Sequence, residues 1–267
     1  MRCCKFCWSL ASEKTIDAIT LHVLLILFVA TLFRSAFGFG EALVAVPLLA
    51  FYIPLEVAAP LAVLVSITIA GIVVVQDWKK IHLVSAIWLV LSTLLGIPLG
   101  LWLLTSSHQT LVKAGLGIII LAFSIYSLLA PRLSGRNGVE LQRDSRLWLF
   151  ICGFSAGVLG GAYGMNGPPL VIYGTMRRWS AQHFRATLQG YFLPASIIGM
   201  CGYWMAGLWV PAVTRYFLIS LPVILLGVYL GRVINHRLHG DTFTKYIYLC
   251  LAGIGALLLI QAAKSRL

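Results

Sequence analysis

Gly160-Gly-Ala-Tyr-Gly164-Met-Asn-Gly-Pro168-Pro169 breaks the apolar sequence of this chain where a membrane helix would otherwise continue. It separates an apolar segment at 147–163 from one at 168–176, which is too short to cross a bilayer because a crossing takes about 20 residues. Asn is a favoured N-cap and Pro is favoured at the first helical position, so this stretch predicts a helix that begins inside the membrane. Such a start carries unpaired N–H groups and the positive end of the helix dipole, which together favour an anion.

A similar block lies in the first half of the chain, Gly38-Phe-Gly40-Glu41-Ala-Leu-Val-Ala-Val-Pro47. The interval from its first Gly to its Pro equals the interval from Gly160 to Pro169, and each block follows a long apolar segment and opens a short one. Broken helices at corresponding places in two halves are typical of transporter binding sites. The alternative is that the glycines only let helices pack closely. Four Gly-x-x-x-Gly pairs have the spacing for such packing: Gly153/Gly157, Gly160/Gly164, Gly96/Gly100 and Gly227/Gly231. For Gly96/Gly100 and Gly227/Gly231 we favour the packing interpretation.

The composition places the chain among membrane proteins. Of its 267 residues, 60% are apolar and 10% are charged, whereas soluble domains carry about 25% charged residues. This composition excludes an ordinary soluble enzyme and a disordered chain. The net charge of +12 resides in short basic clusters between apolar segments, as expected for cytoplasmic loops, so it does not indicate a nucleic-acid partner.

Ten apolar segments are separated by charged and turn residues. They lie at 19–33, 39–53, 57–76, 83–104, 111–130, 147–163, 168–176, 186–206, 211–230 and 245–263. The sequence therefore predicts an all-α polytopic membrane protein with about eight full transmembrane helices and two short broken or re-entrant segments, the second and the seventh. Because each half has five segments, the second half begins on the opposite side of the membrane, which is the pattern of two inverted repeats. We assign 18–130 to the first transmembrane repeat, 131–146 to a cytoplasmic loop and 147–263 to the second repeat.

Basic residues predict the orientation. Lys and Arg follow the third, fifth, seventh and ninth segments, whereas the loops at 54–56, 105–110 and 207–210 carry neither. Because basic loops face the cytoplasm, we expect a multi-pass protein of the cell inner membrane with both termini outside.

Polar residues within the apolar segments are candidates for a transport pathway. An acid in a membrane segment, here Glu41, marks such a pathway or a proton relay by default. The other interpretation is a carboxylate stabilised by the helix N-terminus and by Arg34, and both stay open. The remaining polar candidates are Ser66, Thr68, Thr187, Gln189 and Tyr191. Ser and Thr in helices often bond only their own backbone, whereas a buried Gln needs several partners.

Two other classes of function compete with transport. Gly153-Phe-Ser155-Ala-Gly157 matches the Gly-x-Ser-x-Gly motif of serine hydrolases, but it lies in an apolar segment without the strand–turn–helix context of that motif. A membrane scaffold that transports nothing would need no polar residue at mid-depth. The chain has one Cys-x-x-Cys pair without a second and no Walker A sequence, so we expect no metal, nucleotide or redox cofactor.

In its paired glycine–proline blocks the chain resembles the sulfite exporter TauE/SafE family of bacterial and archaeal inner-membrane transporters. Members repeat a glycine-rich run, a Pro-Leu step and an Ala-Thr-containing helix in each half. Residues 38–49 and 157–171 occupy the runs, and Arg185-Ala-Thr-Leu188 is similar to the second Ala-Thr element. The resemblance covers about residues 20–263. It implies a secondary transporter that exports a small anion, such as sulfite or another sulfur-containing or organic anion, by alternating access.

The expected site is a space between the two half-helices that holds a small anionic solute, within a protein surrounded by the lipid bilayer. A homo-oligomer stays open as an alternative to a single copy. The candidate substrate-binding residues are Gly38, Gly40, Glu41, Gly160, Gly161, Gly164, Asn166, Gly167, Pro168, Thr187 and Gln189.

Overall fold

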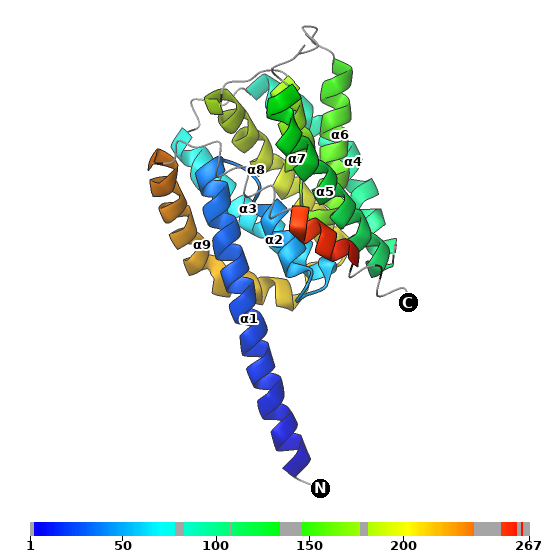
Figure 1. The fold of residues 1–267 in the computed structure, drawn as a ribbon, viewed down its shortest axis with the longest axis vertical. Helices are drawn as coiled ribbons and strands as arrows, with labels where there is room; N and C mark the ends of the chain where they lie inside the picture. Colours follow the sequence, from blue (N-terminus) through cyan, green and yellow to red (C-terminus); the bar gives the residue numbers. More distant parts are fainter. Residues whose placement is uncertain are drawn as a thin grey trace.

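The chain is helical throughout the part that a computed structural model describes. This part comprises residues 3–77, 83–106, 108–133, 146–176, 181–237, 252–260 and 263, and it contains no strand. The bounds of the helices are α1 Cys3–Phe37, α2 Glu41–Leu49, α3 Leu55–Asp77, α4 Leu83–Ser106, α5 Gln109–Leu133, α6 Arg146–Tyr163, α7 Gly167–Met176, α8 Ala181–Met205 and α9 Pro211–Arg237. Residues 252–260 are helical as well, within the tenth predicted segment. The all-α prediction is confirmed for these residues (Figure 1).

Within the described part of the chain, five stretches are long and apolar enough to cross a membrane. They are Ala18–Ser35, Leu55–Val75, Ile87–Ser106, Gln109–Leu129 and Pro211–Val233, and a shorter apolar helix covers Leu147–Tyr163. Large apolar side chains face outward from these helices, among them Trp102 on α4, which is 62% exposed, and Leu225 on α9. Such faces suit contact with lipid rather than water. The protein is therefore a multi-pass membrane protein.

The two predicted short segments are short helices. α2 has 9 residues and α7 has 10, so at 1.5 Å per residue each spans about half of a bilayer. A three-residue link precedes each helix, and both links begin with a glycine at positive φ, Gly38 at 88° and Gly164 at 66°. Residues with a side chain rarely adopt this conformation, so glycine permits the sharp break between the long helix and the short one.

Helix boundaries in the second half of the chain follow those in the first half by a constant number of residues. The paired bounds are Phe37 and Tyr163, Glu41 and Gly167, and Leu55 and Ala181. Each pair is 126 positions apart (163 − 37, 167 − 41 and 181 − 55). The equal Gly–Pro intervals in the sequence imply a displacement of 122 instead, which differs by four residues from the displacement of the helix bounds. Gly160 lies inside α6, whereas its supposed counterpart Gly38 lies in a link.

Helices of the first half pack against helices of the second half, and the first helix of each half packs against the fourth helix of the other. α1 packs along α9, α4 packs along α6, and α3 packs along α8 near the centre. In Figure 1, α1 runs upward from the N-terminus at the bottom, whereas α6 begins at the top and runs downward. The first helix of each half thus contacts the fourth helix of the other half, and the two first helices run in opposite directions.

Glycines bring α4 and α6 into backbone contact. A Cβ atom at Gly96 or Gly100 would collide with the backbone carbonyls of Phe154 or Val158, and one at Gly157 would collide with that of Thr93. Small residues allow this approach between membrane helices. The packing interpretation of the Gly96/Gly100 and Gly153/Gly157 pairs is therefore confirmed.

Candidate functional site

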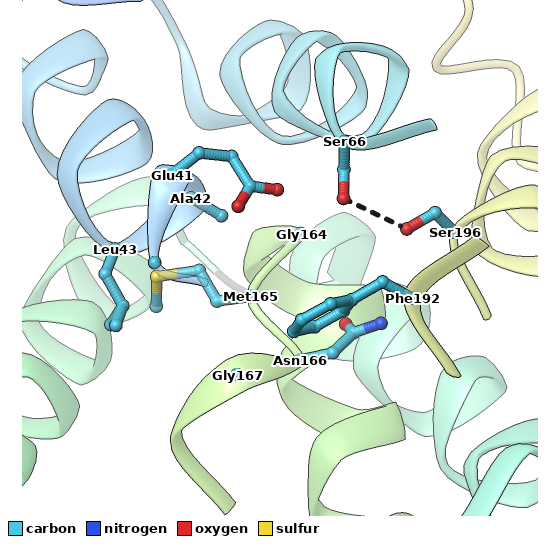
Figure 2. A pocket seen from close by; sticks show the side chains of 11 residues that line it. Glu41, Ala42, Leu43, Ser66, Gly164, Met165, Asn166, Gly167, Phe192 and Ser196 are labelled. Atoms are coloured by element: carbon cyan, nitrogen blue, oxygen red, sulfur yellow. Dashed lines mark hydrogen bonds between the residues drawn. The ribbon is translucent and has the colours of Figure 1, made fainter. Parts of the chain in front are cut away.

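A small buried pocket lies where both short helices begin. It is lined by Gly40, Glu41, Ala42, Leu43, Ser66, Gly164, Met165, Asn166, Gly167, Phe192 and Ser196. Figure 2 shows the start of α2 and the α6–α7 link on one side, with Ser66 on α3 and Phe192 and Ser196 on α8 closing the other side. Its volume is about 10 Å³, close to the minimum that holds one water molecule.

The start of α2 places residues with free backbone donors along this pocket. Gly40 is the N-cap, and no side chain caps the helix. The first four N–H groups of a helix lack partners within that helix. In α2 they belong to the run from Gly40 to Leu43, and all four of these residues line the pocket. The positive end of the helix dipole lies at the same place.

The start of α7 contributes fewer donors. Asn166 precedes the first helical residue, Gly167, and both line the pocket. Pro168 and Pro169 follow in the first turn, where a proline has no N–H to offer. Of the first four positions, only Asn166 and Gly167 therefore present a backbone donor.

A chain of hydrogen bonds fixes the side chain of Asn166. Thr93 Oγ1 donates to the carbonyl of Gly153 at 2.9 Å, so the Tyr191 hydroxyl must donate to Thr93 at 2.7 Å. The Asn166 side chain bonds the same hydroxyl, and because the hydroxyl proton is already used, the amide N–H₂ is the donor. The Asn166 Oδ1 atom lies against Gly160, where a Cβ atom would collide with it. This network ties the α6–α7 link to α4, α6 and α8.

The carboxylate of Glu41 forms a buried ion pair with Arg34 at the end of α1. Arg34 Nη1 also donates to Ser66 Oγ at 2.7 Å, and Ser196 Oγ donates to Ser66 Oγ at 3.3 Å. The guanidinium carbon of Arg34 lies 4.8 Å from the ring centre of Phe192, a cation–π distance. Among the residues whose burial is described, Arg34 and Glu41 are the only buried charged residues.

Several predicted residues lie away from the pocket. Gly38 lies in the link before α2, and Pro168 lies in the first turn of α7. Gly160 accommodates the Asn166 side chain, and Gly161 packs against the α4 carbonyl of Ile97. Thr187 on α8 is buried, and its Oγ1 has no hydrogen-bond partner among the described residues. The side chain of Gln189 falls outside the part of the chain that is described.

Sequence reasoning missed five pocket residues, among them the apolar Ala42 and Leu43 in the first turn of α2; the other three are Met165, Phe192 and Ser196. Ser196 is a polar residue in an apolar segment, the same signal that selected Ser66, so this criterion could have found it. Phe192 and Met165 resemble ordinary core residues and carry no comparable signal in the sequence.

The hydrolase motif has no hydrolase geometry. Ser155 lies in the middle of α6 rather than at a strand–helix bend, and Gly153 and Gly157 on either side of it pack against α4. The described residues contain no group of three or more His, Cys, Asp or Glu side chains that could hold a metal ion.

Comparison with known proteins gives two matches. The family described as Sulfite exporter TauE/SafE matches residues 23–258. A protein of Cupriavidus necator named "Probable sulfite/organosulfonate exporter TauE" is 27% identical over 239 residues, which cover 87% of this chain and 90% of that protein. No solved structure matches the chain.

Proposed function

The chain belongs to the sulfite exporter TauE/SafE family, and we propose that it exports sulfite or a related sulfur-containing or organic anion across the cell inner membrane. Family membership over most of the chain and the name of the Cupriavidus necator relative support this substrate class. The apolar spans support a route through the bilayer.

The observation that carries the proposal is the meeting of two half-helix N-termini at one pocket. Gly40, Glu41, Gly164, Asn166 and Gly167 line the pocket at these two helix starts. Helix N-termini attract anions through free N–H groups and the helix dipole. Secondary transporters place the broken ends of half-helices at the substrate site near mid-membrane. The oxygen atoms of the anion are proposed to accept hydrogen bonds from these backbone groups.

We further propose two inverted repeats, 18–130 and 147–263, joined by a cytoplasmic loop at 131–146. The constant displacement of 126 residues and the exchanged packing of first and fourth helices support this symmetry. The opposite directions of α1 and α6 support the inversion (Figure 1). Rocking of one repeat against the other would open the pocket alternately to the two sides.

The size of the pocket indicates a closed conformation. A volume of about 10 Å³ suits one water molecule, whereas sulfite has a sulfur atom and three oxygens. Anion binding therefore requires the walls to separate. The α3–α8 contact supplies Ser66, Phe192 and Ser196 to one wall, so relative movement of these two helices would enlarge the site.

Efflux from proteoliposomes tests the site. Purified protein in vesicles loaded with radiolabelled sulfite should release it, and Gly164→Leu and Asn166→Leu should each reduce the initial rate at least about tenfold. Gly71→Leu on α3 is the matched control, because a Cβ atom at Gly71 meets nothing within 4 Å. Efflux that both site variants leave unchanged would disprove the site. Wild-type protein that releases neither sulfite nor methanesulfonate nor an organic anion such as acetate would disprove the function.

A further inference from the structure

We propose that Arg34 is the residue that holds the negative charge of the transported anion, and that the Glu41 carboxylate takes the anion's place in the closed conformation. This inference rests on the proposed anion transport and names the charged ligand of the same site. Glu41 is then a tethered competitor that the anion displaces.

Arg34 lies directly behind the wall of the pocket. Its side chain is 0% exposed and does not line the pocket itself. Its contacts with Glu41, Ser66 and Phe192 involve residues that do line it. Figure 2 shows Glu41, Ser66 and Phe192 around the pocket, so a path from the pocket to the guanidinium leads past these side chains. Movement of the Glu41 carboxylate would open that path.

The energetics of burial argue against a purely structural pair. A charge inside a membrane protein is costly, and a buried ion pair seldom repays the loss of hydration of both partners. Apolar residues of similar volume would hold α1 against α2 at lower cost. Arg34 and Glu41 are the only buried charges among the residues of known burial, and their location beside the half-helix termini therefore indicates a functional role.

The chemistry of the two residues fits the exchange. A guanidinium presents a planar fork of donors that matches carboxylate and other oxyanion groups alike. Sulfite and sulfonates present oxygens of the same kind as those of Glu41. The carboxylate would repel an anion that entered beside it, so binding requires either its displacement or its removal from the pocket. Gly40 precedes Glu41 at φ 95°, and a small change at this link would move the carboxylate.

Sulfite efflux and sulfite-dependent thermal stability test the exchange. Glu41→Gln should lower the KM for sulfite at least about tenfold, because the competitor is lost. Sulfite should also raise the Tm of Glu41→Gln more than that of wild type, because the anion replaces the missing partner of Arg34. Arg34→Lys keeps the charge but loses the fork, so its KM should rise at least about tenfold. The neutral double variant Arg34→Gln/Glu41→Gln should fold but bind no sulfite.

Glu56→Gln is the matched control, because Glu56 lies near the start of α3 and bonds Gln109 away from the pocket. Its KM should equal that of wild type. A double variant that transports with wild-type KM would show that the pair only ties α1 to α2, and this result would overturn the inference. An unchanged KM and an unchanged sulfite effect on Tm in Glu41→Gln would also overturn it. Either result, obtained while the wild-type protein transports sulfite, would leave the proposed function intact. Absence of efflux in the wild type would instead contradict both the proposed function and this inference.

Discussion

The carbonyl oxygen of Gly160 on α6 accepts a hydrogen bond from the Tyr203 hydroxyl on α8 at 2.8 Å. The same oxygen accepts the N–H of Gly164 at 2.9 Å, at the point where α6 ends. Tyr203 is fully buried. One side chain on α8 thus secures the helix end from which the link to α7 departs, and this link forms one wall of the pocket.

Tyr203→Phe removes this interhelical bond without changing the volume of the ring. We expect the free energy of unfolding to fall by about 0.6 kcal/mol, the average measured for such bonds between membrane helices, and by no more than about 1.7 kcal/mol, the maximum. Reversible unfolding in mixed detergent micelles measures the change. Tyr229→Phe on α9 is the control, because the Tyr229 side chain is 67% exposed, and its stability should not change. An equal decrease in the free energy of unfolding in both variants would contradict a stabilising role for the hydrogen bond of Tyr203.

Gly96→Ala should destabilise the α4–α6 contact. Its Cβ atom would collide with the backbone carbonyl of Phe154, and overpacking of this kind costs about 1–3 kcal/mol. Thermal denaturation in detergent gives the comparison. Gly71→Ala has open space at its Cβ atom and should be neutral or stabilising by up to about 1 kcal/mol, because Ala favours helix over Gly. A loss of thermal stability in both variants would show that the α4–α6 contact is not the cause of the destabilisation.

Asn166→Asp should abolish anion transport while the fold is kept. The new carboxylate lies at the pocket and repels an anion, and it cannot donate the hydrogen bond that Asn166 gives Tyr191. Sulfite efflux should fall at least about a hundredfold, since a like charge within about 4 Å at intermediate dielectric costs several kcal/mol. Asn166→Ala lacks the charge and should retain more efflux than Asn166→Asp. The reverse order would contradict an anion site.

Phe192→Ala should change which anions are transported. Phe192 lines the pocket and lies against Arg34, so its removal enlarges the space beside the guanidinium. The ratio of efflux of a bulky sulfonate, such as benzenesulfonate, to efflux of sulfite should rise several-fold. Phe150→Ala on α6 removes a ring that is 44% exposed and should leave this ratio at its wild-type value. A ratio that does not respond in Phe192→Ala would place the substrate elsewhere.

The predicted orientation can be measured with single cysteines in a cysteine-free background. His108 lies in the exposed link between α4 and α5, in a loop without Lys or Arg, and Arg232 is exposed near the end of α9. Because basic clusters mark the cytoplasmic side, an impermeant thiol reagent should label His108→Cys in intact cells. It should label Arg232→Cys only after permeabilisation. The opposite pattern would invert the topology.

The short helices could be predicted from local sequence. Gly38, Gly164 and the prolines that follow Asn166 interrupt apolar runs, and chain breaks of this kind depend on a few neighbouring residues. The same glycines misled the comparison of the halves. Gly38 lies in a link, whereas Gly160 lies inside α6 and makes room for the Asn166 side chain, so equal spacing of glycines does not identify equivalent positions.

The membrane class, the ten segments and the two broken helices follow from the sequence by itself, because they depend on composition and on local backbone preferences. Only the tertiary structure decided which polar residues meet. Arg34 contacts Ser66 across 32 positions, and Ser196 reaches Ser66 across 130. Most helices here are apolar on every side, so no polar stripe in the sequence tells which face is directed inward. The rotation of each helix is set by its packing against its neighbours, and that packing brings an ion pair, two serines and two helix termini to one small pocket.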